Sequence, residues 1–321
     1  MTIEAFPFTD DQDDRWDALC RSSVNGTFLH TRAFLSYHET RFEDASVTLF
    51  LNGLVVGVMP AARHPADPRI VVSHPGITYG GIVHDGSVTG SRMIAALEAL
   101  VVYFGGLGYD RMVYKAIPYI YAEVPAQDDL YALFRLGARR SRCDLAATID
   151  LTRRLEPSTR RKRSLKKARK AVILTDDMGV FPGFWEVVAD NLARKHDARP
   201  VHSLAEITLL HRRFPDNILL RAAVVDGRVV AGVLLFVTPR VWHAQYIGSS
   251  ETGYQHSALD AVFEGVIEEA RVRGARYVDF GTSNEDGGRV LNDGLYRFKM
   301  EFGGGGVAYE FFDLDIGEYR P

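Results

Sequence analysis

The residues whose types and spacing could do chemistry are concentrated between Trp242 and Gly306. The run WHAQYIGSS predicts a strand, and a polar loop, an amphipathic helix from about Ser257 and a second strand, YVDFGTSN, follow it. This order directs the N–H groups at the start of the helix into a crevice at the carboxyl end of the first strand, where they attract negative charge. The stretch therefore predicts a site for an anionic or phosphorylated ligand.

Strand alternation decides which of these side chains share a face. One face should carry His243, Gln245 and Ile247, and the opposite face should carry Ala244, Tyr246 and Gly248. The second strand ends with Asp279 and Asn284, whose side chains should face the crevice. Asp279 can accept a hydrogen bond from a sugar hydroxyl, position an ammonium group, or instead cap the following turn.

Several kinds of catalysis have no matching motif in this sequence. It has no G-x-S-x-G, and neither Cys20 nor Cys143 has a histidine beside it that could activate a thiol. HExxH, CxxC and the phosphate-loop pattern G-x-x-x-x-G-K-[ST] do not occur either. We therefore expect neither a covalent enzyme intermediate nor a catalytic metal.

Four segments of the 242–306 stretch resemble the GNAT acyltransferase superfamily, and more closely its Fem-type branch of tandem-GNAT proteins. They are YIGSS, the helix from Ser257, YVDFGTSN, and GLYRFKMEFGG, which resembles the FK-x-x-FGG signature of that branch. In addition, HTRAFLSYH, SHPGITYGGIV, DLYALFRLGARR and the C-terminal run are similar to bacterial nucleotide-sugar N-acyltransferases with the same doubled fold. At the level of architecture the resemblance covers nearly the whole chain, and it implies acyl-CoA as the donor.

The resemblance also implies catalytic roles. Lys299 and the adjacent backbone of Phe298 would lie at the reacting carbonyl, where an ammonium stabilises developing negative charge. Tyr296 can orient the acceptor or protonate the departing thiolate, and His243 can act as the general base, with Asp279 as a further catalytic candidate. The alternatives are a surface lysine, an aromatic residue flanking a core strand, and a buried, hydrogen-bonded structural histidine.

Donor binding is expected along the first strand and the loop after it. In GNAT folds this strand diverges from its neighbour and binds acyl-pantetheine through its main chain. The loop departs from the family's R/Q-x-x-G-x-G/A pattern, because Tyr254 and polar residues follow Gly253, yet Gly253 and the N–H groups before Ala258 can still hold a pyrophosphate. The expected donor-binding residues are Gln245, Tyr246, Gly248, Ser249, Gly253, His256 and Ser257.

Acceptor binding is expected in the first half of the chain and on a basic helix over residues 158–171. His74, Tyr79, Lys115 and Tyr119 offer stacking and charge for a nucleotide diphosphate, although core packing explains the tyrosines equally well. His30 and Arg32 resemble the N-terminal basic contact of the Fem-type proteins. On the basic helix the resemblance selects Arg160 and Arg163, which would bind phosphate. A solvated helix face or a nucleic-acid contact are the other interpretations of that helix.

An internal repeat organises the chain into two halves. Two turn signals, Asn52-Gly53 and Asp226-Gly227, predict hairpins 174 residues apart, and Gly108 and Gly274 precede equivalent strands 166 residues apart. In the first half we also expect helices over 10–22, 31–37 and 91–104 and strands over 70–73, 77–83 and 111–116. The prediction is an α/β fold with mixed sheets: two tandem GNAT-like domains over 1–150 and 151–321, on the acceptor and donor sides of a shared cleft.

Composition is that of an ordinary globular protein. The chain has 321 residues, 46% of them hydrophobic, and a formal charge of −3, which gives no overall field for nucleic acid. Two cysteines favour a reducing cytoplasm over a disulfide framework. The acidic start MTIEAFPFTDDQDD does not look like an export signal, and no apolar run approaches the roughly 20 residues that span a membrane.

These observations lead to one functional hypothesis and two rivals. The hypothesis is N-acyl transfer from acyl-CoA to the amine of a nucleotide-linked amino sugar by direct attack, as in the biosynthesis of cell-surface polysaccharides. One rival is a Fem-type transferase that uses aminoacyl-tRNA and a peptidoglycan precursor. The other is a non-catalytic protein that binds RNA or an acidic partner. The sequence leaves the acyl chain, the sugar and any homo-oligomer open.

Overall fold

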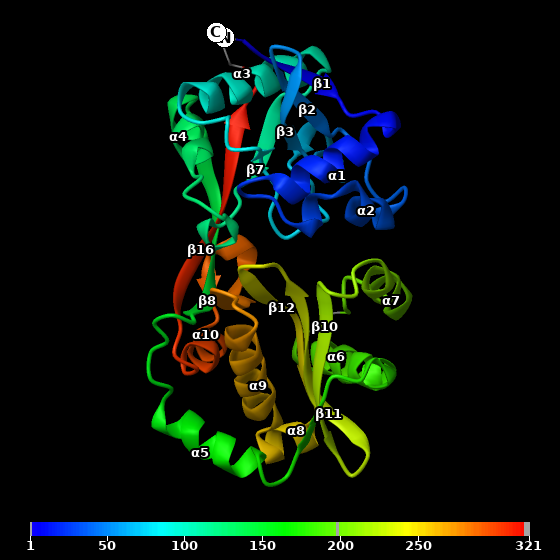
Figure 1. Cartoon of the computed structure of the whole chain (residues 1–321), viewed down its shortest axis with the longest axis vertical. Helices are drawn as coiled ribbons and strands as arrows, with labels where there is room; N and C mark the ends of the chain where they lie inside the picture. The colour runs from blue at the N-terminus through cyan, green and yellow to red at the C-terminus, as the bar shows by residue number, and fades with distance from the viewer. Residues whose placement is uncertain (1, 197–198, 318–321) are drawn as a thin grey trace. The chain divides into compact units, whose positions relative to one another are not determined.

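The computed structural model describes residues 2–196 and 199–317, and the chain divides into two compact units (Figure 1). The first unit comprises Met1–Asp144, Glu285–Val290 and Ala308–Pro321, and the second comprises Leu145–Asn284 and Leu291–Val307. The strands β8 (Arg139–Asp150) and β16 (Gly305–Asp315) each belong in part to both units. The division differs from the expected boundary at 150 chiefly at the end of the chain, because the last part of β16 pairs with a strand of the first unit.

The first unit contains a four-stranded sheet of order β1-β2-β3-β6 and a second run of paired strands, β4-β5-β7-β16. The strands are β1 (Ile3–Pro7), β2 (Val47–Leu51), β3 (Leu54–Met59), β4 (Ala62–His64), β5 (Asp67–Val72), β6 (Val83–His84) and β7 (Arg111–Lys115). The helices are α1 (Asp13–Ser22), α2 (Arg32–Leu35), α3 (Ser91–Gly106) and α4 (Asp128–Arg135), with 3₁₀ turns η1 (Asp10–Gln12), η2 (Phe28–His30), η3 (Ser36–His38) and η4 (Tyr119–Tyr121).

Local sequence signals explain much of this unit. The β2–β3 hairpin turns at Asn52 and Gly53, whose φ angles of 52° and 78° are the left-handed values that a type I′ turn requires. In α3 the buried residues recur at helical spacing, so that one face enters the core: Met93, Ala96, Leu97, Leu100, Val101 and Phe104. The hairpin and this helix were predicted correctly.

The strand predicted over 77–83 is wrong, since only Val83 and His84 are extended and paired. Two adjacent glycines prevent a regular strand here. Gly80 packs against the backbone of Ser73 with no room for a side chain, and Gly81 has a φ of 83°. The segment is therefore an irregular loop, and Ile82 donates its N–H to the hydroxyl of Tyr114 at 2.9 Å instead of to a neighbouring strand.

The second unit contains one sheet of order β8-β13-β12-β11-β10-β9. Its other strands are β9 (Ile173–Thr175), β10 (Ile218–Val225), β11 (Arg228–Val237), β12 (Val241–Ser249) and β13 (Tyr277–Thr282), and short β14 (Asn284–Glu285) pairs with β15 (Val290–Leu291). Its helices are α5 (Thr159–Ala168), α6 (Phe181–His196), α7 (Leu204–Arg213), α8 (Glu251–His256), α9 (Ala258–Val272) and α10 (Asp293–Met300), with η5 (Met178–Val180); η6 (Asp286–Gly288) lies in the first unit.

The second hairpin and the long helix after it are also as predicted. The β10–β11 hairpin turns at Asp226 and Gly227, with φ angles of 49° and 74°. Helix α9 packs its apolar side on the sheet and forms a core with Trp242, Val233 and Phe280. On the other face of the sheet, Gly232 and Gly248 give room for Phe184 and Val188 of α6. The sheet thus has a helix on each face.

A bulge in β12 makes the predicted alternation wrong. Leu234 of β11 pairs with Tyr246 and Leu235 pairs with Ala244, so Gln245 is an extra residue without a partner on β11. Trp242 and Ala244 face the core under α9, but beyond the bulge it is Ile247 that packs there. Tyr246 contacts Trp185 and Gly248 approaches Val188, both on α6, the face opposite to Ala244. The extra residue exchanges the two faces, as any one-residue shift must.

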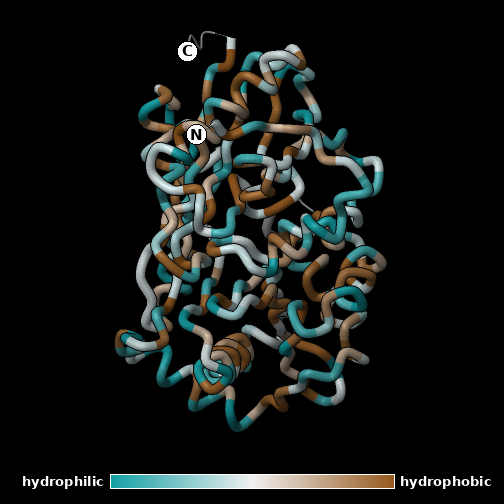
Figure 2. Tube along the Cα trace, turned by 45° about the horizontal axis from the view of Figure 1, so that its top comes forward, coloured by the Kyte–Doolittle hydropathy of each residue, from teal (hydrophilic) through white to brown (hydrophobic). Residues whose placement is uncertain are grey.

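Hydrophobic residues lie in short brown stretches separated by hydrophilic ones along the trace in Figure 2. Among the residues that the structure describes, no helix is both long enough and apolar enough to span a membrane.

Candidate functional site

His243 and Asp279 form a buried pair in the second unit. They are direct neighbours on the parallel strands β12 and β13, and Nδ1 of His243 lies 2.7 Å from Oδ2 of Asp279. Asp279 is fully buried, while 11% of the His243 side chain is exposed. A carboxylate can only accept here, so Nδ1 of His243 donates to Asp279 and Nε2 is the nitrogen left for proton transfer. The arrangement holds an imidazole in the form that can act as a base.

The carboxylate of Asp279 is fixed by two further donors. The hydroxyl of Thr148 on β8 and the N–H of Gly281 both donate to Oδ1, each at 3.0 Å. Sequence reasoning predicted Asp279 and His243 separately but gave no role to Thr148. The signal for Thr148 is its position on β8 directly opposite Asp279, which the sequence alone does not reveal.

Lys299 lies close to this pair, on α10, and is buried with only 3% of its surface exposed. Its Nζ donates to the carbonyl oxygens of Gly281 and Thr282 at 3.0 and 2.7 Å. Burial lowers the pKa of Lys299 to about 8, although Asp279 nearby opposes that effect. The alternative of a surface lysine is therefore wrong. Its predicted contact with a reacting carbonyl stays a prediction.

The two strands that carry the pair separate directly after it. Parallel pairing between β12 and β13 runs from Val241 and Tyr277 to His243 and Asp279 and ends there. Gln245 follows at the bulge, and its Oε1 is buried without a hydrogen-bond partner among the described residues. The divergence of β12 expected from the family resemblance is thus present, with His243 at the point where it begins.

Two of the residues expected to bind donor make contacts inside the second unit. The hydroxyl of Tyr246 lies 2.7 Å from Nδ1 of His202, and burial raises the pKa of this phenol. Ser249 is buried, and its carbonyl accepts from Asn191 at 2.7 Å. Because of the bulge, Tyr246 lies on the same face of the strand as Gly248, next to α6. These contacts shape β12, and the predicted roles in donor binding stay predictions.

The expected phosphate loop after β12 is a helix, so that prediction is wrong in structure. Ser250 caps α8 and accepts from the N–H of Gly253 at 3.2 Å, and Gly253 packs against the backbone of Val230. The N–H groups of Tyr254 and Ser257 also bond to carbonyls within the turn. Ser257 follows His256 with a left-handed φ of 54° and connects α8 to α9. The N–H groups expected to cradle a pyrophosphate are thus engaged within the helix.

The predicted basic helix is present as α5, but its arginines differ in environment. Arg160 pairs with Glu301, with Nε 3.0 Å from Oε2, whereas Arg163 is exposed. Arg161, which sequence reasoning missed, is buried over the rings of Phe298 and Phe302. Its guanidinium donates to Asp260 of α9 at 2.7 Å and to the carbonyl of Phe298 at 2.9 Å. Arg161 thus fastens α5 to α9 and α10.

The remaining candidates of this unit lie around α10. Burial raises the pKa of the half-buried Tyr296, which keeps its phenol protonated. Phe298 packs against the cluster of α9 and contributes its carbonyl to Arg161. Asn284 uses its Oδ1 to accept from the N–H of Leu145 at 2.6 Å, so this amide connects the end of β13 to β8.

In the first unit, His30 and Arg32 are engaged in local structure. His30 is fully buried and accepts from the N–H of Thr27 at 3.0 Å, and burial lowers its pKa to about 4. It is therefore neutral near pH 7, and its predicted contact with the acceptor stays a prediction. Arg32 bonds to Asp44 at 2.6 Å and lies over the ring of Phe8.

Lys115 and His74 lie together in the first unit. Nζ of Lys115 donates to the carbonyls of His74, at 3.2 Å, and Ile77, and burial lowers the pKa of Lys115 to about 7. Burial, with His38 and Lys115 close by, also lowers the pKa of His74 well below its ordinary value. Tyr79 is buried and packs against Tyr121 with its ring tilted, whereas Tyr119 is 51% exposed.

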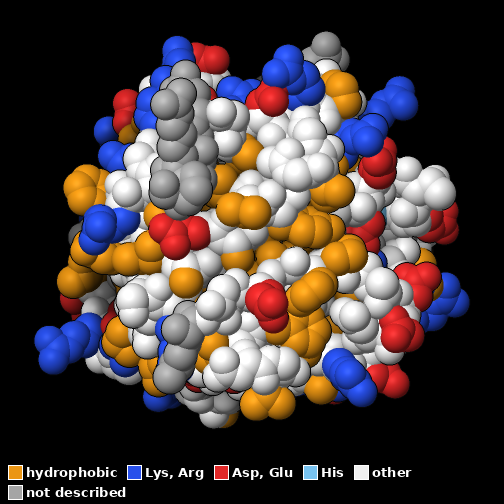
Figure 3. Space-filling view, turned by 90° about the horizontal axis from the view of Figure 1, so that it is seen from above, with side chains coloured by type: hydrophobic (Ala, Val, Ile, Leu, Met, Phe, Trp, Pro, Cys, Tyr) orange, Lys and Arg blue, Asp and Glu red, His pale blue; other side chains and the backbone are white. Residues whose placement is uncertain are grey.

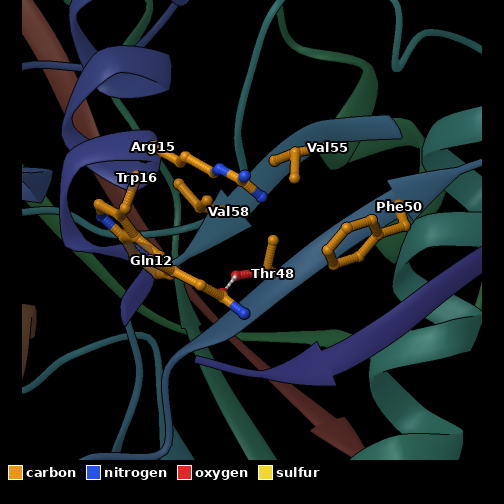
Figure 4. A pocket seen from close by; sticks show the side chains of 7 residues that line it. All are labelled: Gln12, Arg15, Trp16, Thr48, Phe50, Val55 and Val58. Atoms are coloured by element: carbon orange, nitrogen blue, oxygen red, sulfur yellow. Dashed lines mark hydrogen bonds between the residues drawn. The ribbon is translucent and has the colours of Figure 1, made fainter. Parts of the chain in front are cut away.

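Two cavities lie within single units. One, of about 30 Å³, is lined by residues of η1, α1, β2 and β3 (Figure 4). In it Thr48 donates to Gln12 at 3.0 Å, and its size suits about one water molecule. The other, of about 240 Å³, lies between β9, β10 and α9 and includes the Arg221–Glu269 ion pair. Neither cavity contains a residue of the predicted site.

Charged side chains are dispersed on the face shown in Figure 3, where lysines and arginines stand apart among hydrophobic and uncharged groups. The described residues drawn on that face form no continuous basic surface of the kind that binds nucleic acid.

Known proteins resemble this chain in two ways: a domain family matches part of its sequence, and solved structures match its fold. Residues 152–300 match the acetyltransferase (GNAT) domain family, and no curated protein matches the sequence. Among solved structures, FemX has a TM-score of 0.68 at 13% identity and covers 98% of both chains. L-PGS from Bacillus licheniformis has a TM-score of 0.61 at 11% identity, over 96% of this chain and 92% of that one. A tandem GNAT protein from the clavulanic acid biosynthesis pathway has a TM-score of 0.55 at 13% identity, over 99% of this chain and 100% of that one.

The class of protein follows from these matches. Residues 152–300 match the GNAT domain family, and the protein is an acyltransferase. The chain has the mixed α/β fold of FemX and of tandem GNAT proteins along its length, which confirms the predicted fold class. The non-catalytic alternative is not supported. At such low identity the structural matches describe the fold alone, and the substrates have to be proposed from the site.

Proposed function

We propose that this acyltransferase moves an acyl group from acyl-CoA to the amine of a nucleotide-linked amino sugar. The observation that carries the proposal is the His243–Asp279 pair at the point where β12 and β13 separate. An imidazole whose Nδ1 is held by a carboxylate, at a gap between strands, is suited to take a proton on Nε2 from an amine whose attack is directed at a bound thioester.

The reaction is a single acyl transfer from sulfur to nitrogen. The neutral amine attacks the thioester carbonyl, so that a C–N bond forms, the C–S bond breaks and CoA leaves as its thiolate. Nε2 of His243 accepts the proton that the amine nitrogen loses, and Asp279 stabilises the imidazolium. The phenol of Tyr296, kept protonated by its surroundings, gives the thiolate its proton. No covalent enzyme intermediate is needed.

The acceptor assignment is supported by charge on the second unit. Helix α5 exposes Arg163, Lys166 and Lys167, and these cations are suited to the diphosphate of a nucleotide sugar, whereas Lys162 pairs with Glu156. Arg160 can add to them only if it gives up its pair with Glu301.

Aminoacyl transfer from aminoacyl-tRNA to a peptidoglycan precursor is the second candidate. The observation in its favour is the run Phe298–Gly304, which resembles the FK-x-x-FGG signature of Fem-type proteins and contains Lys299. The same fixed imidazole can serve either reaction.

A thiol-release assay tests the proposal. The full chain would be incubated with a panel of acyl-CoA thioesters and amino-sugar nucleotides, and free CoA would be measured with a thiol reagent. We expect release that depends on both substrates and is lost in H243Q. If no pair of substrates gives release while an aminoacyl-tRNA is consumed in the presence of a peptidoglycan precursor, the second candidate replaces the first.

A further inference from the structure

The end of β13 has an irregular backbone. Gly281 has a φ of 72°, and the pairing of β13 with β8 shifts register between Asp279 and Thr282. In a regular strand, successive carbonyls point to opposite sides. Here the carbonyls of Gly281 and Thr282 converge on one atom, Nζ of Lys299. The left-handed glycine makes this convergence possible, because other residues rarely adopt such a φ.

In a regular strand the carbonyl of Gly281 would continue the pairing with β12, whereas Thr282 pairs with Ala146 of β8 on the other side. Pairing between β12 and β13 ends at His243 and Asp279, so Gly281 and Thr282 come just beyond the last paired residue. On the opposite strand, Gln245 bulges at the same level. A backbone carbonyl that already accepts from an ammonium is less able to attract an N–H group of the neighbouring strand.

Holding an ammonium here costs free energy. Lys299 is 3% exposed, and its ammonium donates to two carbonyls. Burying a charge without a directly bonded counter-charge is unfavourable, since the ammonium gives up its hydration. Helix α10 is held in place by Arg161, which bonds to the carbonyl of Phe298 beside the lysine. The lysine is thus presented to β13 by an anchored helix.

We propose that Lys299 is a positioning residue that keeps β13 apart from β12. By binding the carbonyls of Gly281 and Thr282, it leaves the main chain of residues 244–249 open on one edge. The amide groups of an acyl-CoA donor can then add to that edge as a short strand would. The binding of the donor to this edge rests on the proposed function, because it needs a donor that carries amides. The role of Lys299 in separating the strands does not rest on that function.

Amide hydrogen exchange on the full chain without substrate tests the separation. In K299M, which keeps the length of the side chain but removes its donors, the released carbonyl of Gly281 can pair with β12. We expect peptides covering residues 244–249 to exchange at least about tenfold more slowly than in the wild type. K299R, whose guanidinium can bond to both carbonyls, should restore wild-type exchange. R297M removes an exposed cation from the same helix and should change nothing.

Calorimetric titration with CoA tests the consequence for the donor. K299M should bind CoA at least about tenfold more weakly, with a larger effect on KM for the donor than on kcat, and K299R should bind nearly as well as the wild type. If K299M does not fold, the comparison uses K299Q. Unchanged or faster exchange at 244–249 in the variant would overturn the proposal. A wild type that fails to bind CoA, with the exchange result as expected, would instead refute acyl-CoA as donor and leave the role of Lys299 standing.

Discussion

Val72 pairs with Val113 in the first unit at the register position where His243 pairs with Asp279 in the second. In each unit a parallel pair of strands, β5–β7 or β12–β13, makes three residue pairs, and these side chains are the last of the three. The repeated sheet therefore has a polar pair in one copy and an aliphatic pair in the other. Valine can neither accept nor donate a proton, so only the second copy can supply a base at this place.

The first prediction concerns H243Q. We expect kcat for thiol release to fall by about 10²- to 10⁴-fold, because proton removal from the amine loses its base. No residual activity should come from the first unit, given its valines. H211Q is the matched control, since His211 lies on α7 of the same unit and bonds to the carbonyl of Ile218. Wild-type kcat in H243Q would contradict the role of this histidine.

D279N tests the tautomer. An asparagine amide would donate to Nδ1 of His243 and so move the imidazole proton to Nε2, where the lone pair is needed. We expect kcat to fall by about 10²-fold or more while the far-ultraviolet circular dichroism stays that of the wild type. D216N, at an exposed loop position, should be fully active. An active D279N would mean that the carboxylate does not orient a catalytic base.

Arg161 should matter for stability more than its neighbour on the same helix. R161M leaves Asp260 buried without its partner, which we expect to lower the free energy of unfolding by about 3–5 kcal/mol. R160M removes an ion pair whose arginine side chain is 64% exposed, and should cost less than about 1 kcal/mol. Urea denaturation measures both. Equal losses would show that burial of Arg161 contributes nothing.

Lys115 should make stability depend on pH. Its pKa is about 7 in the folded chain instead of the ordinary 10.5, so between those values the unfolded chain binds more protons and stability rises with pH. The difference in unfolding free energy between wild type and K115M should thus shift in favour of the wild type as pH rises from 7. The change can reach about 1.4 kcal/mol for each pH unit. Urea titrations at pH 6, 8 and 9.5 measure it, and a constant difference would contradict a buried, titrating lysine.

Local chemistry made part of the fold predictable. Asn52-Gly53 and Asp226-Gly227 favour the left-handed turn of a hairpin whatever surrounds them, and both hairpins are present. The similar spacings of the repeated signals, 174 and 166 residues, predicted the doubled fold. By contrast, the bulge at Gln245 is set by the pairing of β12 with β11. The residue type at Gln245 does not by itself predict a bulge.

Helix α8 and the buried Arg161 were not predicted, although the sequence contains a signal for each. Ser250 followed by Glu251 could have indicated a helix start, yet the glycine and polar residues after it favoured a loop, and the structure has α8 there. Arg161 occupies the helical position four residues before Leu165 and seven before Ala168, the apolar stripe of α5. Its charge suggested solvent, whereas two aromatic rings and Asp260 make that position part of the interior.

The return of β16 to the first unit has a consequence for how the protein is made. Phe311 to Asp315 pair with β7, between Lys115 and Arg111, so a ribosome that has released residues 1–144 has not yet supplied one neighbour of that strand. The second unit can close almost entirely from residues synthesised earlier. During translation, the first unit is therefore completed only after the residues of the second unit have been made.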